Sequence, residues 1–365
     1  MRATPRHVGP ALMANLSVLD LVPVGVGTSP ADALVHSTEL IQRAEELGYH
    51  RHWVAEHHNM PGIASTSPPV LIAHLAAHST TIRVGSGGVM LPNHPPLIVA
   101  EQFGTLAALH PGRIDLGIGR APGTDPRTAA AIRFGRLEEA VDDFPRALAE
   151  LVAFIEDRVV GVAAHPRPPG APEVWLLGSS DFSAQLAGLL GRPFSFAHHF
   201  SAANTMPALA AYRRAFRPSE HLGQPHVMVA VSVICAEDDE RADWLAGPSR
   251  LSFVRRRTGR PQPLPTPEEA ARHELSPSER EPLRSWGAGS IVGGPGTVRN
   301  RLARLLADTR ADEVMVTTLV HGHADRLRSY ELLAGLWPAV EAEVLPEAGT
   351  VVADVRNGAA LGSGA

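Results

Sequence analysis

The chain has 365 residues, and its 33 basic and 38 acidic side chains give a formal net charge of −5, with neither sign gathered into a long block. This balance argues against a nucleic-acid-binding surface, so small molecules or other protein chains are the expected partners. Every basic residue is arginine, and the absence of lysine excludes a P-loop, pyridoxal phosphate chemistry and a Schiff-base aldolase. Cys235 is the only cysteine, which excludes intrachain disulfides and cysteine-based zinc or redox sites. The first residues lack the apolar core of a signal peptide and no apolar run reaches membrane length, so we expect a cytoplasmic protein without a membrane partner.

Short apolar runs alternate with longer segments of helical periodicity almost to the end of the chain. The predicted strands are Leu16–Leu21, His52–Ala55, Ile82–Leu91, Ile114–Ile118, Val174–Gly178, Phe194–Ala197, Val227–Cys235 and Glu313–Leu319. The first helix is expected to begin at Ser29-Pro30 and to end at Gly48, and others near Pro68, Pro96, Ser180 and Asn204. Strands that are each followed by a helix predict a parallel sheet with right-handed crossovers. Eight such strands favour an α/β fold of the closed (β/α)8 TIM barrel type over an open, doubly wound sheet.

We expect one barrel domain over residues 15–345, between flexible segments at residues 1–14 and 346–365. Segment 255–290 is rich in Pro, Arg and Glu and poor in large apolar residues, which indicates an insertion before the last strand. Its composition is closer to that of a solvated excursion than to that of an active-site lid.

The active site of a barrel forms from the loops that follow the carboxyl ends of the strands. Glu56, His57 and His58 lie at such an end, in the stretch WVAEHHNMPGIAS. More histidines follow other predicted strands, namely His94, His198, His199, His321 and His323. Several imidazoles on one rim favour a functional role, and a metal-dependent hydrolase stays an alternative, although no His-Glu-x-x-His motif occurs and we expect no metal. The candidates for a substrate pocket are His58, Met60, His198, His199 and His321.

The stretch RVGSGGVMLPNHPP places Gly85, Gly87 and Gly88 within a predicted strand. Glycine weakens a strand, because it loses more entropy on ordering and packs no side chain. Either a flat cofactor approaches the backbone there, or the strand has a bulge at a corner of the barrel. We expect a cis peptide or a bulge at Gly87–Gly88, forming a flat surface beside His57.

Two further strand ends carry groups that suit an anion. The stretch RIDLGIGRAPGTD matches the dinucleotide-binding fingerprint poorly. We expect instead that the forked guanidinium of Arg120 binds an anionic group. In VWLLGSSDFSAQLAG, Ser179, Ser180 and Ser183 surround the start of a helix, where free N–H groups and hydroxyls can bind phosphate. Ordinary capping explains one of these serines but not three, and the Gly-x-Ser-x-Gly motif of acyl transfer is absent.

Together, WVAEHHNMPGIAS, VGSGGVMLPNHPPLIVAEQFGTLAALHPGRIDLGIGRAPGTD, WLLGSSDFSAQLAGLLGRPFSFAHHF and DEVMVTTLVHGHADRLRSYELL resemble the bacterial luciferase-like, flavin-dependent monooxygenase family, over residues of about 15–345. The resemblance implies a two-component oxidoreductase that takes reduced FMN (FMNH2) from a separate flavin reductase and uses O2 to oxygenate a small organic substrate, with secondary metabolism as one setting. It implies that Arg120, Ser179, Ser180 and Ser183 hold the FMN phosphate and that Gly87–Gly88, joined by a cis peptide, supports the isoalloxazine. It also makes Glu56 and His57 the acid and the catalytic imidazole.

Ser179 resembles the residue at the matching position in the non-luminous branch of the family, so we do not expect light emission. The resemblance leaves two alternatives open, a deazaflavin-dependent dehydrogenase and a non-catalytic flavin-binding protein. It also implies a homodimer formed through helices near the start of the chain, such as residues 31–48. The sequence does not name the substrate.

Overall fold

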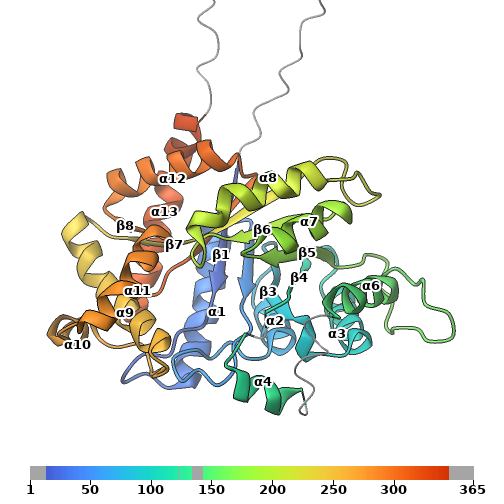
Figure 1. The fold of residues 1–365 in the computed structure, drawn as a ribbon, viewed down its shortest axis with the longest axis horizontal. Helices are drawn as coiled ribbons and strands as arrows, with labels where there is room; N and C mark the ends of the chain where they lie inside the picture. Colours follow the sequence, from blue (N-terminus) through green and yellow to red (C-terminus); the bar gives the residue numbers. More distant parts are fainter. Residues whose placement is uncertain (1–13, 122, 134–142, 345–365) are drawn as a thin grey trace, which may run out of the picture.

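The computed structural model describes residues 14–121, 123–133 and 143–344 (Figure 1). Apart from residue 14, the two terminal segments that were expected to be flexible lie outside the described residues. Eight strands close into a parallel barrel in which each strand pairs with its neighbours, in the order β1-β2-β3-β4-β5-β6-β7-β9 and back to β1. These strands are β1 (Asn15–Asp20), β2 (Arg51–Val54), β3 (Arg83–Met90), β4 (Ile114–Gly119), β5 (Glu173–Gly178), β6 (Phe194–Ala197), β7 (Val227–Cys235) and β9 (Glu313–Thr317). The predicted TIM barrel and all eight predicted strands are confirmed.

A ninth strand, β8 (Ser290–Gly293), lies outside the barrel and pairs in parallel with Ser232–Cys235 at the end of β7. The sequence did not predict it. It closes the segment at 255–290, which also holds the end of α9 (Asp239–Arg257), α10 (Pro267–Arg272) and α11 (Pro277–Ala288). The segment is therefore folded against the barrel end of β7 rather than forming only a solvated excursion.

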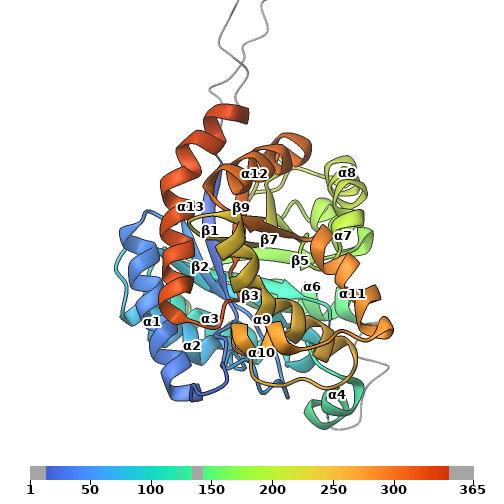
Figure 2. The same ribbon diagram turned by 90° about the vertical axis from the view of Figure 1, so that its left-hand side faces the viewer.

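Helices surround the barrel, and their starts follow the predicted capping signals. Helix α1 (Pro30–Glu46) has a capping box between Ser29 and Asp32, and Gly48 follows its end with a φ of +79° that suits glycine. Helix α13 (His323–Val344) runs between α1 and α12 (Figure 2). The remaining helices are α2 (Pro68–Ala77), α3 (Pro96–Leu109), α4 (Pro126–Ile132), α6 (Phe144–Ile155), α7 (Asp181–Leu189), α8 (Thr205–Ala215) and α12 (Pro295–Thr309), with short 3-10 turns η1 (Leu91–Asn93) and η2 (Ala202–Asn204).

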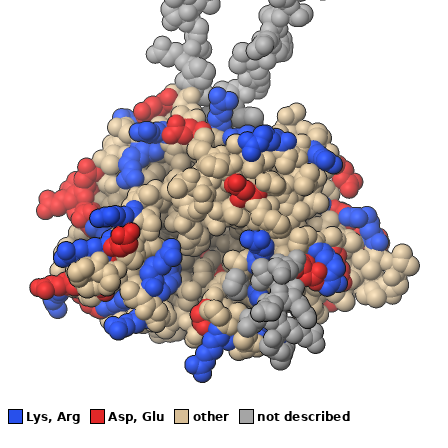
Figure 3. Space-filling view, viewed as in Figure 1, with Lys and Arg blue, Asp and Glu red and all other residues tan. Residues whose placement is uncertain are grey.

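Surface charge and helix composition bear on the expected partners, which stay predictions. On the face shown in Figure 3, basic and acidic side chains are interspersed without a large patch of one sign. Within the described ranges, none of the helices combines the length and the apolar character that a bilayer crossing requires. The cytoplasmic location stays a prediction.

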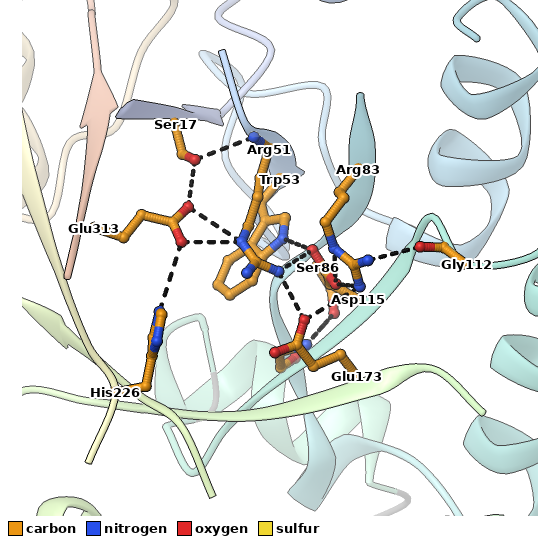
Figure 4. A network of polar contacts seen from close by, with 11 residues as sticks. Ser17, Arg51, Trp53, Arg83, Ser86, Gly112, Asp115, Glu173, His226 and Glu313 are labelled. Atoms are coloured by element: carbon orange, nitrogen blue, oxygen red, sulfur yellow. Dashed lines mark hydrogen bonds and ion pairs between the residues drawn. The ribbon is translucent and has the colours of Figure 1, made fainter. Parts of the chain in front are cut away.

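Charged side chains at the amino ends of the strands form a buried network, shown in Figure 4. The Arg51 guanidinium lies 2.9 Å from Asp115, 3.0 Å from Glu173 and 3.1 Å from Glu313, so it pairs with carboxylates from three other strands. The Trp53 indole N–H donates to the Asp115 carboxylate at 2.9 Å. We call Ser17, Arg51, Arg83, Asp115, Glu173, His226 and Glu313 the amino-end cluster.

The amino-end cluster closes the barrel on the side away from the strands' carboxyl ends. Asp115 and Glu313 are fully buried, and Arg51 is 4% exposed. Burial by itself opposes ionisation, but the Arg51 guanidinium holds the pKa of Glu313 below its usual range. The same carboxylates raise the pKa of Arg51 in spite of its burial. Full pairing is therefore the condition under which these charges are tolerated.

We expect Arg51→Met to lower the free energy of unfolding by about 3–5 kcal/mol, because it leaves buried carboxylates without their cation. Urea denaturation followed by circular dichroism measures the change. Arg43→Met is the matched control and should change stability far less. Arg43 lies on the exposed face of α1, where it pairs with Glu46 and Glu331. Equal losses in the two variants would contradict the account.

Candidate active site

A cavity of about 380 Å³ opens at the carboxyl ends of the barrel strands. Every barrel strand or the loop directly after it contributes to its wall, through Leu19, Ala55, Gly87, Gly119, Leu177, Ala197, Ala230 and Met315 among others. Helix α9, Trp286 of α11 and Ser290 of β8 complete the wall. The cavity thus lies where a barrel enzyme has its active site.

Gly87 and Gly88 form a flat part of the cavity wall. The peptide bond between them is cis, and the register with β4 shifts between Gly87 and Val89, which confirms the predicted backbone irregularity. A Cβ atom on Gly87 would lie 2.7 Å from the Leu19 side chain, and one on Gly88 would lie 2.7 Å from the Gly117 carbonyl oxygen. A side chain at position 88 would collide with backbone, and one at position 87 would displace the Leu19 side chain. With glycine at both positions, the cavity is bordered there by bare backbone.

Four groups that suit an anion line the cavity at the ends of β4 and β5, namely Arg120, Ser179, Ser180 and Ser183. Ser180 is the N-cap residue of α7, yet its hydroxyl makes no capping hydrogen bond. The Arg120 guanidinium lies 4.5 Å from the centroid of the Phe182 ring and pairs with no described carboxylate. Three hydroxyl-bearing residues at the start of α7 and a cation that pairs with no described carboxylate therefore line one part of the cavity, which we call the anion cradle.

His57 lines the cavity, as the Gly87–Gly88 wall does. Its backbone N–H donates to the Ser65 carbonyl at 3.0 Å, whereas its buried Nδ1 has no hydrogen-bond partner among the described residues. Burial, together with the charge of Arg256, lowers the pKa of His57 to about 4. The imidazole is therefore neutral at pH 7 and can either accept or donate a proton at the cavity.

His199 is the second imidazole in the cavity wall. Its Nδ1 lies 2.9 Å from the Ala230 carbonyl oxygen. Because a carbonyl only accepts hydrogen bonds, Nδ1 carries the proton and Nε2 of the neutral ring presents a lone pair. Burial lowers the pKa of His199 to about 4, so this tautomer persists at neutral pH.

Glu56 does not line the cavity and is fully buried beside it. Its carboxylate accepts a hydrogen bond from the Met90 N–H at 2.9 Å and contacts Nε2 of His58 and of His94, each at 2.9 Å. Although burial opposes ionisation, these contacts lower the pKa of Glu56 to about 2. Glu56 is thus a constant anion that joins the loops after β2 and β3 next to the cavity, and its role as the acid stays a prediction.

Four other expected pocket residues, His58, Met60, His198 and His321, are not in the cavity wall, and their contact with a substrate stays a prediction. His58 is held by Glu56, His198 contacts the Thr205 hydroxyl at 2.8 Å, and His321 contacts the Val26 carbonyl oxygen at 2.9 Å. Of the histidines expected at the mouth, His57 and His199 line the cavity.

One face of α9 was missed by the sequence analysis. Ser249, Ser252, Phe253 and Arg256 line the cavity together. Their spacing of three, four and seven residues is that of a single helical face, so periodicity within α9 could have indicated them. The expectation of a solvated excursion is therefore wrong for Arg256, and also for Trp286 and Ser290.

Among the described residues, one group of three possible metal ligands lies close enough together to share an ion, namely Glu156, Glu220 and His221. These residues are not in the cavity wall. Glu156 is already paired with Arg158 and Arg192. The metal-dependent hydrolase therefore receives no support from the arrangement of the described cavity histidines.

The closed barrel and its cavity at the carboxyl ends of the strands define a TIM-barrel protein whose cavity lies where such barrels have their active sites. The sequence pattern of the luciferase-like monooxygenases matches residues 15–313, and the chain belongs to this family. It is therefore a monooxygenase-type oxidoreductase by family.

Individual proteins support this assignment. The chain is 48% identical over 320 residues to a luciferase-like monooxygenase of Escherichia coli K12, covering 87% of this chain and 95% of that protein. It is 35% identical over 331 residues to an N-acetyl-S-alkylcysteine monooxygenase of Bacillus subtilis 168, covering 88% and 98% of the two chains. The crystal structure of apo-MsnO8 is similar with a TM-score of 0.84 at 41% identity, covering 89% of this chain and 98% of that one.

We expect His57 and His199 to stay neutral down to about pH 5, because the pKa of each is lowered to about 4. An NMR pH titration of the ring signals, assigned with His57→Gln and His199→Gln, measures both values. Arg256→Met should raise the two pKa values, since its charge lowers both, whereas Arg257→Met should not. Protonation of either ring near pH 6.5 would contradict this arrangement.

The same shifts set the sign of the pH effect on stability. Between pH 6.5 and about 4 the unfolded chain binds protons on these imidazoles and the folded chain does not. Stability therefore falls as the pH falls through this window.

Proposed function

We propose that this protein is an FMN-dependent monooxygenase that takes reduced FMN from a separate flavin reductase and oxygenates a small organic substrate with O2. The observation that carries the proposal is the joint presence, in one cavity, of the anion cradle, the bare Gly87–Gly88 backbone and His57. Members of the family use FMN or the deazaflavin F420. An FMN complex of a 3,6-diketocamphane monooxygenase component has the same fold at 19% identity, with a TM-score of 0.66.

The residues of the cavity fit the parts of FMN. Arg120 with Ser179, Ser180 and Ser183 would hold the phosphate, because a dianion forms its strongest hydrogen bonds with a guanidinium and with N–H groups at a helix start. Gly87–Gly88 would lie against the planar ring, since side chains are absent there. Reduced FMN, when bound, supplies the electrons that activate O2.

His57 supplies a proton-transfer group beside the glycine wall. Its ring is neutral at pH 7 and lines the cavity, so the part of the ring that faces the cavity can accept or donate a proton, whereas Nδ1 is buried. A positioned general acid or base contributes about 10²–10⁴-fold to a rate. Apolar lining residues such as Leu19, Leu177 and Leu319 exclude water from the same cavity.

We expect Arg120→Ala to weaken FMN binding at least tenfold and to leave riboflavin binding nearly unchanged, because only FMN carries the phosphate. Anaerobic titrations with reduced FMN, reduced riboflavin and a reduced deazaflavin give the dissociation constants. Arg127→Ala, in the exposed first turn of α4, is the control. Equal losses for FMN and riboflavin would contradict the phosphate assignment, and tighter binding of the deazaflavin would favour the dehydrogenase.

We also propose a homodimer through the neighbouring helices α1, α2 and α3. Large apolar side chains are exposed on all three, with Val35 56%, Val70 71% and Ile98 45% accessible. Exposed apolar side chains gathered on adjacent elements are typical of a surface that another chain covers.

We expect Val70→Asp to dissociate the dimer, which sedimentation velocity at micromolar concentration measures. Val160→Asp is the control, since Val160 is 98% exposed in the loop after α6. A wild-type monomer, or dissociation by both variants, would contradict the proposed interface.

A further inference from the structure

A second arginine faces the cavity from α9. Arg256 lines it together with Ser249, Ser252 and Phe253, and it pairs with no carboxylate among the described residues. Its neighbour Arg255 differs, because its guanidinium pairs with Glu269 at 2.7 Å. The two adjacent arginines therefore have separate roles, one in an ion pair between helices and one in the cavity.

Arg256 is partly buried and has no described carboxylate as its partner. Burial lowers the pKa of Arg256, and the charge of Arg257 adds to this effect. The Arg256 guanidinium lies 5.6 Å from the centroid of the Phe253 ring, which offsets part of the lost hydration but supplies no counter-ion. An anionic ligand would supply the missing partner.

Arg256 and Arg120 mark different parts of the cavity. Arg120 lies over Phe182 at the start of α7, within the anion cradle. Arg256 lies on α9, and of the arginines it has the largest effect on the imidazoles of His57 and His199. If the cradle takes the single phosphate of FMN, the cation beside the two histidines is left for another molecule.

We propose that Arg256 binds the carboxylate of the organic substrate, so that this enzyme oxygenates small carboxylic acids. The inference rests on the proposed function, because it takes the anion cradle as the FMN phosphate site. The hydroxyls of Ser249 and Ser252 extend the polar side of this subsite, and Phe253 and Phe200 offer apolar contacts. Nε2 of His199, with its lone pair, accepts a hydrogen bond from an N–H or O–H of the same molecule.

Two matched probes test the carboxylate. N-acetyl-L-methionine carries a carboxylate, an amide N–H and an apolar side chain, and N-acetyl-L-methioninamide has a neutral carboxamide in place of the carboxylate. Calorimetry on the flavin-free protein should show at least tenfold tighter binding of the acid, because a guanidinium forms charge-assisted hydrogen bonds with a carboxylate. Equal binding of the two probes, or no binding of either, would overturn the proposal.

Three variants assign the preference to Arg256. Arg256→Met should abolish the preference for the acid and leave the FMN dissociation constant within threefold of wild type. Arg257→Met, at the exposed neighbour of Arg256, should keep the preference, and Arg120→Ala should keep it while weakening FMN binding. Thermal unfolding of flavin-free Arg256→Met should occur at the wild-type temperature or higher, because an unpaired cation is removed.

The outcomes separate this proposal from the proposed function. If Arg256→Met weakens FMN as strongly as Arg120→Ala does and keeps the preference for the acid, Arg256 is a flavin ligand and the carboxylate proposal is wrong. If the wild type binds no FMN but still prefers the acid through Arg256, the flavin assignment fails and the carboxylate site stands.

Discussion

The complete pairing of the buried charges around Arg51 is the interaction on which the rest of this structure depends. Carboxylates from β4, β5 and β9 meet one guanidinium from β2 at the amino ends of the strands. Such charges are costly to bury, and only mutual pairing offsets the loss of hydration. Because the cluster closes that end of the barrel, the cavity opens at the carboxyl ends, where the loops can differ without disturbing the closure.

Arginine has opposite roles at the two ends of the barrel. In the amino-end cluster Arg51 contacts three carboxylates, whereas Arg120 and Arg256 in the cavity contact none among the described residues. The paired arginine stabilises the fold, and the unpaired ones are available to ligands. This contrast supports a cavity that takes two anionic groups, the phosphate of a flavin and the carboxylate of a substrate.

The fold was largely predictable because its signals are local. Apolar runs alternating with helical segments indicated the eight barrel strands, and Ser29-Pro30 marked the start of α1. Strand β8 was missed because Ser-Ile-Val-Gly holds only two large apolar residues and adjoins a segment whose composition indicated an insertion. Its position is set by pairing with β7, a contact between distant parts of the chain.

The site was predictable in its backbone and less so in its side chains. Gly87–Gly88, Arg120 and the three serines reach the cavity as expected, but the rim histidines do not all do so. His198 and His199 lie in the turn after β6, where the adjacent residues His199 and Phe200 both line the cavity. After β2, Ala55 and His57 line the cavity while Glu56 and His58 do not. Side chains of an extended chain alternate between two faces with a period of two residues. The sequence contains this period, but it does not show which of the two faces points into the barrel.

The measurement that tests the central claim most directly is a crystal structure of the protein with FMN. The account predicts the phosphate within hydrogen-bonding distance of Arg120 and the serines of the anion cradle, the ring against Gly87–Gly88 with His57 beside it, and Arg256 free of contact with the flavin. A phosphate bound at Arg256, or a ring placed away from the glycine wall, would contradict it.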